Sequence, residues 1–164
     1  MPVEIRSASA SDAALIAGLI ARAFARQQVA VEPPQSALRF SEGDVDAHFA
    51  AGGSGALAIM DNFPAGSVLW MPSADGFYLS RLAVDPAMRR NGAGLKLLEA
   101  AQGSARAAGA SHITLRTRVG LTGNRALFAK AGFTETAFRA HDGFDHPTSV
   151  ELEWRAVCRA PAHG

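Results

Sequence analysis

Apolar and polar positions along the chain repeat with two periods, one typical of strands and one typical of helices. Alternating or short continuous apolar runs predict seven strands, at residues 3–6, 56–60, 66–71, 76–84, 112–118, 133–140 and 149–156. Apolar residues spaced three or four apart predict helices through residues 15–24, 41–51, 92–108 and 124–131. The resulting order, β-α-α-β-β-β-α-β-α-β-β, predicts an α/β (α+β) protein whose mixed sheet carries helices on its faces.

Turn and capping residues mark the ends of these elements. Ser9 and Ser11 are start signals for the first helix, and Ser41 is the expected cap of the second. Gly109 is the expected end of the third helix. The turn formers at residues 61–65 predict a hairpin between the second and third strands.

Composition limits the class of protein. A length of 164 residues predicts a single domain over residues 1–158, with 159–164 as a frayed tail. A formal net charge of +1 argues against a broad nucleic-acid-binding face, which would be strongly basic. The single cysteine, Cys158, excludes an internal disulfide and fits a reducing compartment.

No stretch of the sequence has the features of a targeting segment or a membrane span. The first six residues include Glu4 and no long apolar core. No apolar run approaches the roughly 18–20 residues that would cross a bilayer. We therefore expect a cytoplasmic protein that does not contact a membrane.

The most informative stretch is residues 82–94, in which a strand gives way to a helix. An apolar strand ends at Val84, and Arg89, Arg90, Gly92 and Gly94 open the helix after a short turn. Glycines let a backbone approach a ligand closely, and the N–H groups and dipole of a helix N-terminus favour an anion. This pattern predicts a pyrophosphate cradle to which the arginines add charge.

The same stretch is also compatible with a purely structural role. The glycines could serve a tight turn and close helix packing, and Arg90 could be a solvated surface charge. A nicotinamide-binding loop is a weaker competitor, because the Gly-x-Gly-x-x-Gly spacing is missing and no βαβ unit begins at the N-terminus.

Arg89-x-x-Gly92-x-Gly94 resembles the acetyl-CoA-binding motif of the GNAT N-acetyltransferase superfamily. The segment Leu127–Phe133, Leu-Phe-Ala-Lys-Ala-Gly-Phe, resembles the short helix that lies one strand further along in that family. The resemblance covers nearly the whole chain. It implies the acyl-CoA N-acyltransferase fold, with a mostly antiparallel sheet of about seven strands.

The resemblance also implies acetyl-CoA as the acyl donor and a set of residues that bind it. The pyrophosphate would lie on the backbone of Arg89, Arg90, Asn91, Gly92, Ala93, Gly94 and Leu95. The pantetheine arm would pair with the strand at Leu82, Ala83 and Val84, after a bulge where the fourth and fifth strands part. A backbone N–H in this segment is the expected stabiliser of the oxyanion.

Two positions depart from the family pattern. The tyrosine that protonates the leaving thiolate in many members is Phe128 here, which has no proton to give, so solvent or another group would serve. We expect Phe128 to pack beside the cofactor. The usual asparagine aligns with Leu121, and Asn124, three residues later, would either cap a shortened helix or bond the pantetheine arm.

Tyr78 takes the place of a glutamate that some members use as a base. It is the expected catalytic residue of this sequence, as a proton relay, although a phenol with a pKa of about 10 is a poor base at neutral pH. Packing in the core or in the substrate pocket is the simpler role of Tyr78.

Three polar clusters have less certain roles. His141, Asp142, Asp145 and His146 form either a substrate-facing loop or a metal site, and we expect no metal because the family reaction needs none. Glu42, Asp44 and Asp46 either receive a cationic amine or compensate the charge of a helix end. Arg116 and Arg118 are interpreted as the polar face of a strand.

We therefore expect an N-acetyltransferase that moves the acetyl group of acetyl-CoA to a primary amine by direct attack in a ternary complex. The acceptor, a small molecule, an amino acid, or a protein N-terminus or lysine, stays open. The alternatives are a non-catalytic acyl-CoA sensor, and an enzyme that takes a longer acyl chain, which the room beside Ala83 would decide. A homodimer through residues 149–156 is possible, although Val150, Leu152 and Trp154 on that strand are more simply core.

Overall fold

The computed structural model describes residues 2–25, 40–88 and 91–156. They form one seven-stranded sheet with the order β1-β2-β3-β4-β5-β7-β6. The strands are β1 (Glu4–Ser7), β2 (Ser54–Met60), β3 (Phe63–Ser73), β4 (Gly76–Val84), β5 (His112–Arg118), β6 (Thr134–Arg139) and β7 (Ser149–Arg155). The helices are α1 (Ala13–Ala25), α2 (Glu42–Ala50), α3 (Ala93–Ala107) and α4 (Thr122–Lys130), with short 3₁₀ turns at Ala10–Asp12 and Pro86–Met88.

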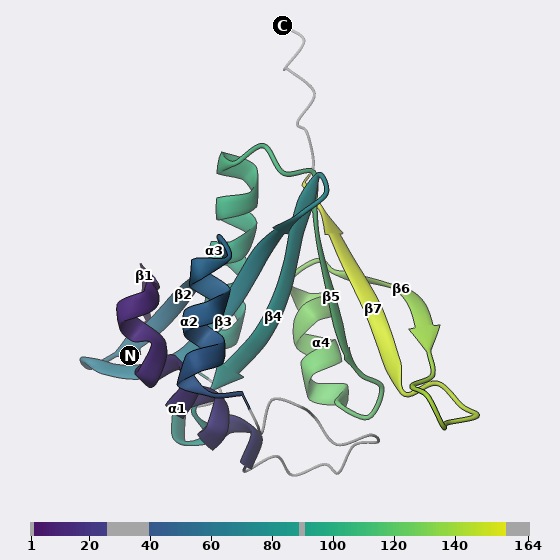
Figure 1. The fold of residues 1–164 in the computed structure, drawn as a ribbon, viewed down its shortest axis with the longest axis horizontal. Coiled ribbons are helices and arrows are strands. Elements are labelled where there is room, and N and C mark those ends of the chain that lie inside the picture. The colour runs from purple at the N-terminus through teal and green to yellow at the C-terminus, as the bar shows by residue number, and fades with distance from the viewer. Residues whose placement is uncertain (1, 26–39, 89–90, 157–164) are drawn as a thin grey trace, which may run out of the picture.

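Helices cover both faces of the sheet (Figure 1). On one face α1 and α2 pack on β2, β3 and β4 through a small core in which Ile16, Leu19 and Leu69 are fully buried. On the other face α3 and α4 lie over a larger core that includes Leu97 and Phe128. The helical periodicity of the sequence anticipated this arrangement, since an apolar stripe on each helix needs a sheet face to bury it.

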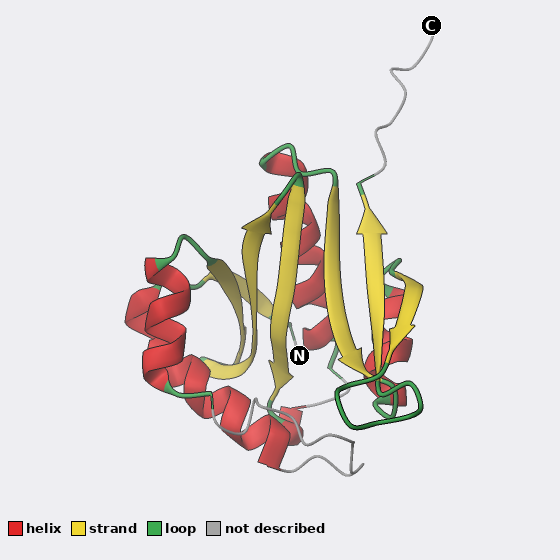
Figure 2. Ribbon diagram, turned by 45° about the vertical axis from the view of Figure 1, so that its right-hand side comes forward, coloured by secondary structure: helices red, strands yellow, loops and turns green. Residues whose placement is uncertain are grey.

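All neighbouring strands are antiparallel except β4 and β5, which run in parallel. Among the described residues these two pair only at Phe77 with Ile113 and at Tyr78 with Thr114. Beyond Tyr78 they diverge toward their C-terminal ends (Figure 2). The sheet therefore opens along its middle, and one edge of β4 faces the opening.

A bulge in β4 lies beside this opening. Ser67 pairs with Ala83 and Leu69 with Ser80, so Arg81 and Leu82 together face one residue of β3. Arg81 has a φ of 54°, a left-handed conformation that costs a non-glycine residue about 1 kcal/mol. The extra residue reverses the alternation of β4, because Leu79 and Leu82 both contact the α3 core, whereas Ala83 contacts the α1 core.

The predicted element order and the fold class are confirmed, with ends that shift by a few residues. The hairpin turn is shorter than expected: only Asp61 and Asn62 lie between β2 and β3, both with positive φ, so Phe63 already belongs to β3. For residues 149–156 the structure confirms the core role, and a homodimer stays a prediction. β7 lies between β5 and β6, so both its edges are already paired, and Val150, Leu152 and Trp154 are buried in the core.

Several predictions fall on residues outside the described ranges. These are Arg89 and Arg90 of the proposed cradle, Cys158, and the domain boundary and tail at residues 158–164. Within the described part of the chain, no helix is both long and apolar enough to span a bilayer.

Candidate active site

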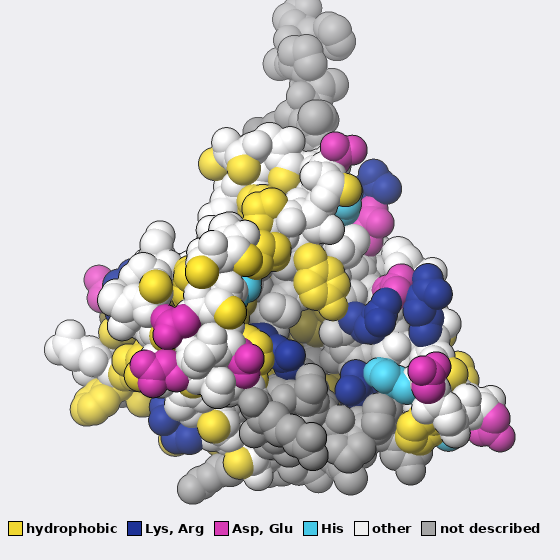
Figure 3. Space-filling model, viewed as in Figure 1, with side chains coloured by type: hydrophobic (Ala, Val, Ile, Leu, Met, Phe, Trp, Pro, Cys, Tyr) yellow, Lys and Arg dark blue, Asp and Glu magenta, His cyan; other side chains and the backbone are white. Residues whose placement is uncertain are grey.

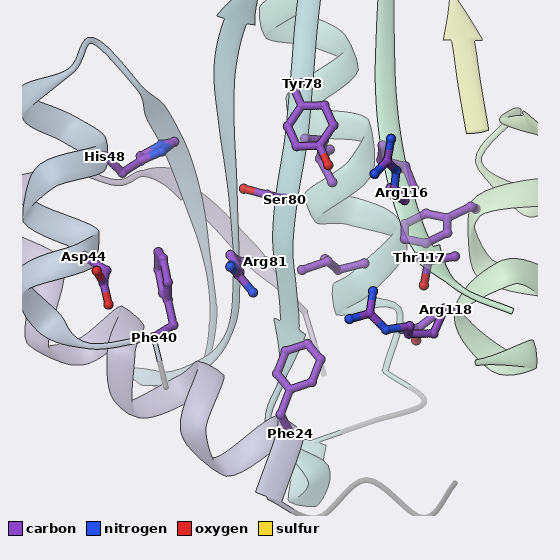
Figure 4. Close-up of a pocket in the computed structure, with 15 residues that line it drawn as sticks. Phe24, Phe40, Asp44, His48, Tyr78, Ser80, Arg81, Arg116, Thr117 and Arg118 are labelled. Atoms are coloured by element: carbon purple, nitrogen blue, oxygen red, sulfur yellow. The ribbon is translucent and has the colours of Figure 1, made fainter. Parts of the chain in front are cut away.

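A pocket of about 420 Å³ lies where β4 and β5 part (Figure 4). Its walls come from α1, α2, the two strands and α4, which are far apart in the sequence. The residues that line it are Phe24, Phe40, Asp44, His48, Tyr78, Leu79, Ser80, Arg81, Leu82, Leu115, Arg116, Thr117, Arg118, Asn124 and Phe128. Four residues that the sequence singled out for the site, Tyr78, Leu82, Asn124 and Phe128, therefore meet in one place.

The N-terminus of α3 presents backbone N–H groups near the end of β4. Gly92 caps the helix with a φ of 80°, and no atom lies within 4 Å of the position its Cβ would take. The Lys96 N–H donates to the Gly92 carbonyl at 3.0 Å, so the preceding N–H groups, of Ala93, Gly94 and Leu95, come before the first intrahelical bond. Gly92 has a positive φ and open space around its Cβ position, and three such N–H groups follow it. This arrangement fits the binding of an anionic group.

Packing also accounts for one of the two glycines. A Cβ on Gly94 would lie 2.9 Å from Cδ2 of Leu127, so α3 approaches α4 through this position. Asn91 uses its side-chain amide to donate to the Met88 carbonyl at 3.2 Å, which closes the turn before the helix. Turn and packing roles therefore operate here alongside the N–H groups that precede the first intrahelical bond.

α4 forms the other wall of the opening. Gln102 of α3 is buried and donates from Nε2 to the Ala131 carbonyl at 2.7 Å, which fixes the end of α4. Phe128 is 4% exposed, and its ring meets that of Phe133 edge to face at 5.9 Å between centroids. The Phe128 side chain thus belongs to the core and to the pocket wall at once.

The prediction that Asn124 caps a shortened helix is wrong. α4 begins at Thr122 after an N-cap at Leu121, so Asn124 is the third residue of the helix. Asn124 lines the pocket.

Tyr78 and His48 face the pocket from opposite sides (Figure 4). Tyr78 is 42% exposed and belongs to the last residue pair that joins β4 to β5. His48 of α2 lies 2.9 Å through Nε2 from the Ser54 carbonyl, so Nε2 carries the proton and Nδ1 is the basic nitrogen of the neutral ring. His48 was not identified from the sequence, although the acidic residues Glu42, Asp44 and Asp46 of the same helix were considered for the acceptor side.

Three arginines also line the pocket: Arg81 on the β4 bulge, and Arg116 and Arg118 on β5. Figure 3 shows basic side chains on both sides of the hollow at the centre of this face. Burial lowers the pKa of Arg81, and the neighbouring Tyr78 and Asp44 side chains oppose the shift. Burial lowers the pKa of Arg118 as well, and repulsion from Arg81 and Arg116 adds to it.

The arginine cluster corrects part of the sequence interpretation. Arg116 and Arg118 do form the polar side of β5, opposite the buried Ile113 and Leu115, but that side is a wall of the pocket. Arg81 was not identified from the sequence at all. Only its position on the bulge brings it to the opening.

The structure shows contacts for one residue of the acidic cluster, Asp44, and one residue of the histidine cluster, His141. The Asp44 carboxylate accepts hydrogen bonds from the N–H of Ser41 at 2.8 Å and from its hydroxyl at 3.0 Å, which completes a capping box and lowers the pKa of Asp44. Helix capping therefore accounts for Asp44, although it also lines the pocket. In the loop before β7, His141 contacts the Thr148 hydroxyl through Nδ1, and burial followed by the charges of Arg118 and Arg116 lowers its pKa.

Metal binding has no support in the described part of the chain, where no three His, Cys, Asp or Glu side chains are grouped to hold an ion. Backbone donors at one end and arginines at the other make the opening a site for anionic and polar groups.

Comparison with solved structures gives the same fold. PaiA N-acetyltransferase from Thermoplasma acidophilum, solved with coenzyme A, has a TM-score of 0.77 at 18% identity, over 95% of this chain and 100% of that one. The ribosomal-protein-S18-alanine N-acetyltransferase of Escherichia coli has a TM-score of 0.76 at 19% identity, over 98% of both chains. A ribosomal-protein-alanine N-acetyltransferase from Brucella melitensis has a TM-score of 0.72 at 16% identity, over 93% of this chain and 99% of that one. No curated protein sequence matches this chain with significance.

The sequence matches the model of the acetyltransferase (GNAT) family over residues 20–133, and the chain belongs to that family. Membership of the family, together with the fold, makes it an acyl-CoA-dependent N-acetyltransferase. Acetyl-CoA is its acyl donor.

Proposed function

We propose that the chain transfers the acetyl group of acetyl-CoA to a primary amine by direct attack in a ternary complex. The observation that carries this proposal is the opening of the sheet beside the N-terminus of α3. It links the N–H groups that precede the first intrahelical bond of α3 with the pocket, along the edge of β4 that, beyond Tyr78, pairs with no other described strand. An extended pantetheine arm fits such an edge, because it can bond a strand as another strand would.

The donor is assigned to backbone groups on one side of this path. The pyrophosphate binds the N–H groups from Asn91 to Leu95, with Arg89 and Arg90 supplying charge. The pantetheine arm bonds the β4 edge at Leu82–Val84 and contacts Asn124, while Phe128 packs beside it. The side chain of Ala83 is buried in the α1 core and does not line the pocket, so it does not limit the acyl chain.

The proposed chemistry requires two proton movements. The neutral amine forms a bond to the acetyl carbon, a backbone N–H of the Leu82–Val84 segment stabilises the oxyanion, and the carbon–sulfur bond then breaks. The Tyr78 phenol accepts the amine proton while its own proton passes to water. The CoA thiolate takes a proton from solvent, because Phe128 has none.

Calorimetric titration with acetyl-CoA tests the donor site. Wild-type protein should bind with micromolar affinity, and Gly92→Glu should bind at least tenfold more weakly, because a carboxylate would stand against the pyrophosphate. Gly109→Glu is the matched control: Gly109 ends the same helix with a φ of +74° and open space at its Cβ, as at Gly92. Equal losses in the two variants, or no binding by the wild type, would contradict the donor assignment.

Release of the CoA thiol with and without added amines tests the transfer. Thioester loss that depends on the amine supports transfer. Tight binding of acetyl-CoA without such loss across a broad panel of amines would instead favour a sensing role. A cytoplasmic location and the oligomeric state stay predictions, and sedimentation at micromolar concentration measures the latter.

A further inference from the structure

His48 is held in one orientation on the wall of the pocket. Its Nε2 lies 2.9 Å from the Ser54 carbonyl oxygen. A Cβ on Gly53 would collide with this nitrogen and its two ring neighbours, so the glycine backbone lies close against the edge of the ring. On α2, the ring of Phe49 meets the imidazole edge to face, at 5.2 Å between centroids. The protein itself therefore fixes the position of this side chain.

The contact with Ser54 also fixes where the ring accepts a proton. A carbonyl oxygen only accepts hydrogen bonds, so Nε2 carries the proton of the neutral ring and the lone pair lies on Nδ1. His48 lines the pocket. Within the described part of the chain, Nδ1 has no hydrogen-bonding partner. The basic nitrogen is therefore available to a group or a water molecule in the pocket.

The other ionisable groups of the pocket are poorer proton acceptors. The Asp44 carboxylate accepts two hydrogen bonds from Ser41, which lower its pKa, so it takes up a proton less readily. The phenol of Tyr78 is a poor base at neutral pH, and the guanidinium groups have no lone pair to offer. Histidine is the side chain suited to exchange a proton near pH 7. Among the described residues that line the pocket, this chemistry belongs to His48 alone.

His48 lies across the pocket from Tyr78. Asp44 and His48 are four residues apart on α2, so they share the face of the helix that lines the pocket. Figure 4 shows His48 on the α2 side and Tyr78 on β4. A volume of about 420 Å³ leaves room for water beside a small amine. A proton that leaves Tyr78 for water can therefore reach Nδ1 without leaving the pocket.

We propose that His48 is the final proton acceptor of the transfer, through Nδ1. The amine nitrogen bonds the acetyl carbon and gives its proton to the Tyr78 phenol, which releases its own proton to water, and this water passes a proton to His48. The imidazolium returns that proton to solvent after the products leave. The CoA thiolate takes a separate proton from solvent, so the charges balance. This inference rests on the proposed transfer and adds a residue to it.

His48→Gln removes the base and keeps a donor for the Ser54 carbonyl. We expect kcat to fall about ten- to hundredfold, with acetyl-CoA affinity and both KM values near those of the wild type. Release of the CoA thiol with the most reactive amine measures this. The double variant with Tyr78→Phe should be no slower than the slower single variant, because both groups serve one proton path.

Chemical rescue separates a base from a packing role. His48→Ala opens a space beside Ser54 that a free azole can enter. Imidazole should recover part of kcat, whereas pyrazole, which has the same size but is a far weaker base, should not. Equal rescue by the two azoles would show that the ring only fills space, and would overturn the inference.

A substitution that leaves His48 in place tests its orientation. The methyl group of Gly53→Ala would displace the ring from the Ser54 carbonyl, so kcat should fall as in His48→Gln. Gly43→Ala on the same helix is the matched control, because its Cβ would meet only Ser41 Oγ at an ordinary 3.6 Å. We expect wild-type kcat for this control.

The outcomes distinguish this inference from the proposed function. Wild-type kcat in His48→Gln, or effects of His48→Gln and Tyr78→Phe that multiply, would overturn the shared proton path and leave the transfer proposal intact. No release of thiol by the wild type with any amine would contradict the proposed function itself, and the inference with it.

Discussion

The two halves of the opening are built from different parts of the chain. The donor half that we propose consists of backbone groups between Leu82 and Leu95, of which the structure describes residues 82–88 and 91–95, where a strand ends and α3 begins. The acceptor half consists of side chains from α1, α2, β4 and β5, which the sheet brings together. Backbone donors hold groups that are common to every CoA thioester, whereas side chains distinguish one acceptor from another.

This difference decides how much each half can vary. Changes of side chain leave N–H groups in place, so the donor half depends mainly on backbone conformation, as at Gly92 with its positive φ. The acceptor half depends on the length and charge of individual side chains such as Arg118. Substitutions in the shared walls should therefore have the largest effects, and changes of a single polar group in the acceptor half the smallest.

Phe128→Ala should have the largest effect, because Phe128 forms a wall common to both halves. The ring is 4% exposed, so its removal should lower the free energy of unfolding by about 3 kcal/mol or more and weaken acetyl-CoA binding. Urea denaturation measures the stability, with Phe138→Ala as the control at a phenylalanine that is 52% exposed. Equal losses in the two variants would show that Phe128 is not part of the wall.

Gly66→Ala should have the next largest effect, through the strand that supports both halves. A Cβ on Gly66 would lie 2.8 Å from the Ala83 carbonyl oxygen and 3.2 Å from Cδ1 of Leu97, which forces β3 away from β4 and α3. We expect a loss of about 1–3 kcal/mol in the free energy of unfolding. Gly103→Ala on the open surface of α3 should instead gain up to about 1 kcal/mol. Similar values for the two variants would contradict the close packing at Gly66.

The difference between contiguous backbone groups and side chains from distant elements also explains which residues could be predicted from the sequence. Periodicity and turn residues predicted all seven strands and the helix order, because each element depends on local spacing. The donor motif was recognisable because its residues are contiguous. Arg81 and His48 were not found, since only the bulge and the packing of α2 bring them to the pocket. The sequence identified Arg116 and Arg118 as the polar face of a strand. It did not show that Arg81 lines the same pocket.

Tyr78→Phe should reduce kcat about tenfold with little change in the KM of either substrate. The phenol oxygen is the group we assign to the proton relay, and water can replace only part of its effect. Steady-state rates across pH 6 to 9 with the preferred amine measure this. Unchanged kcat across that range would end the catalytic assignment and leave Tyr78 as a wall of the pocket, with His48→Gln as the next variant to measure.

The pKa of His141 should report the positive charge of Arg118 and Arg116. The ionisation of His141 should have the smallest effect on the free energy of unfolding among these predictions. Burial and the charges of Arg118 and Arg116 hold its pKa below the ordinary value of about 6.5, so the folded protein binds its proton less readily than the unfolded chain does. The stability tied to this group is therefore present above about pH 6.5 and falls as the pH drops toward the lowered value. NMR titration should find a higher His141 pKa in Arg118→Gln than in the wild type. A wild-type pKa at or above 6.5, or one unmoved by the variant, would mean that the charge of Arg118 does not reach His141.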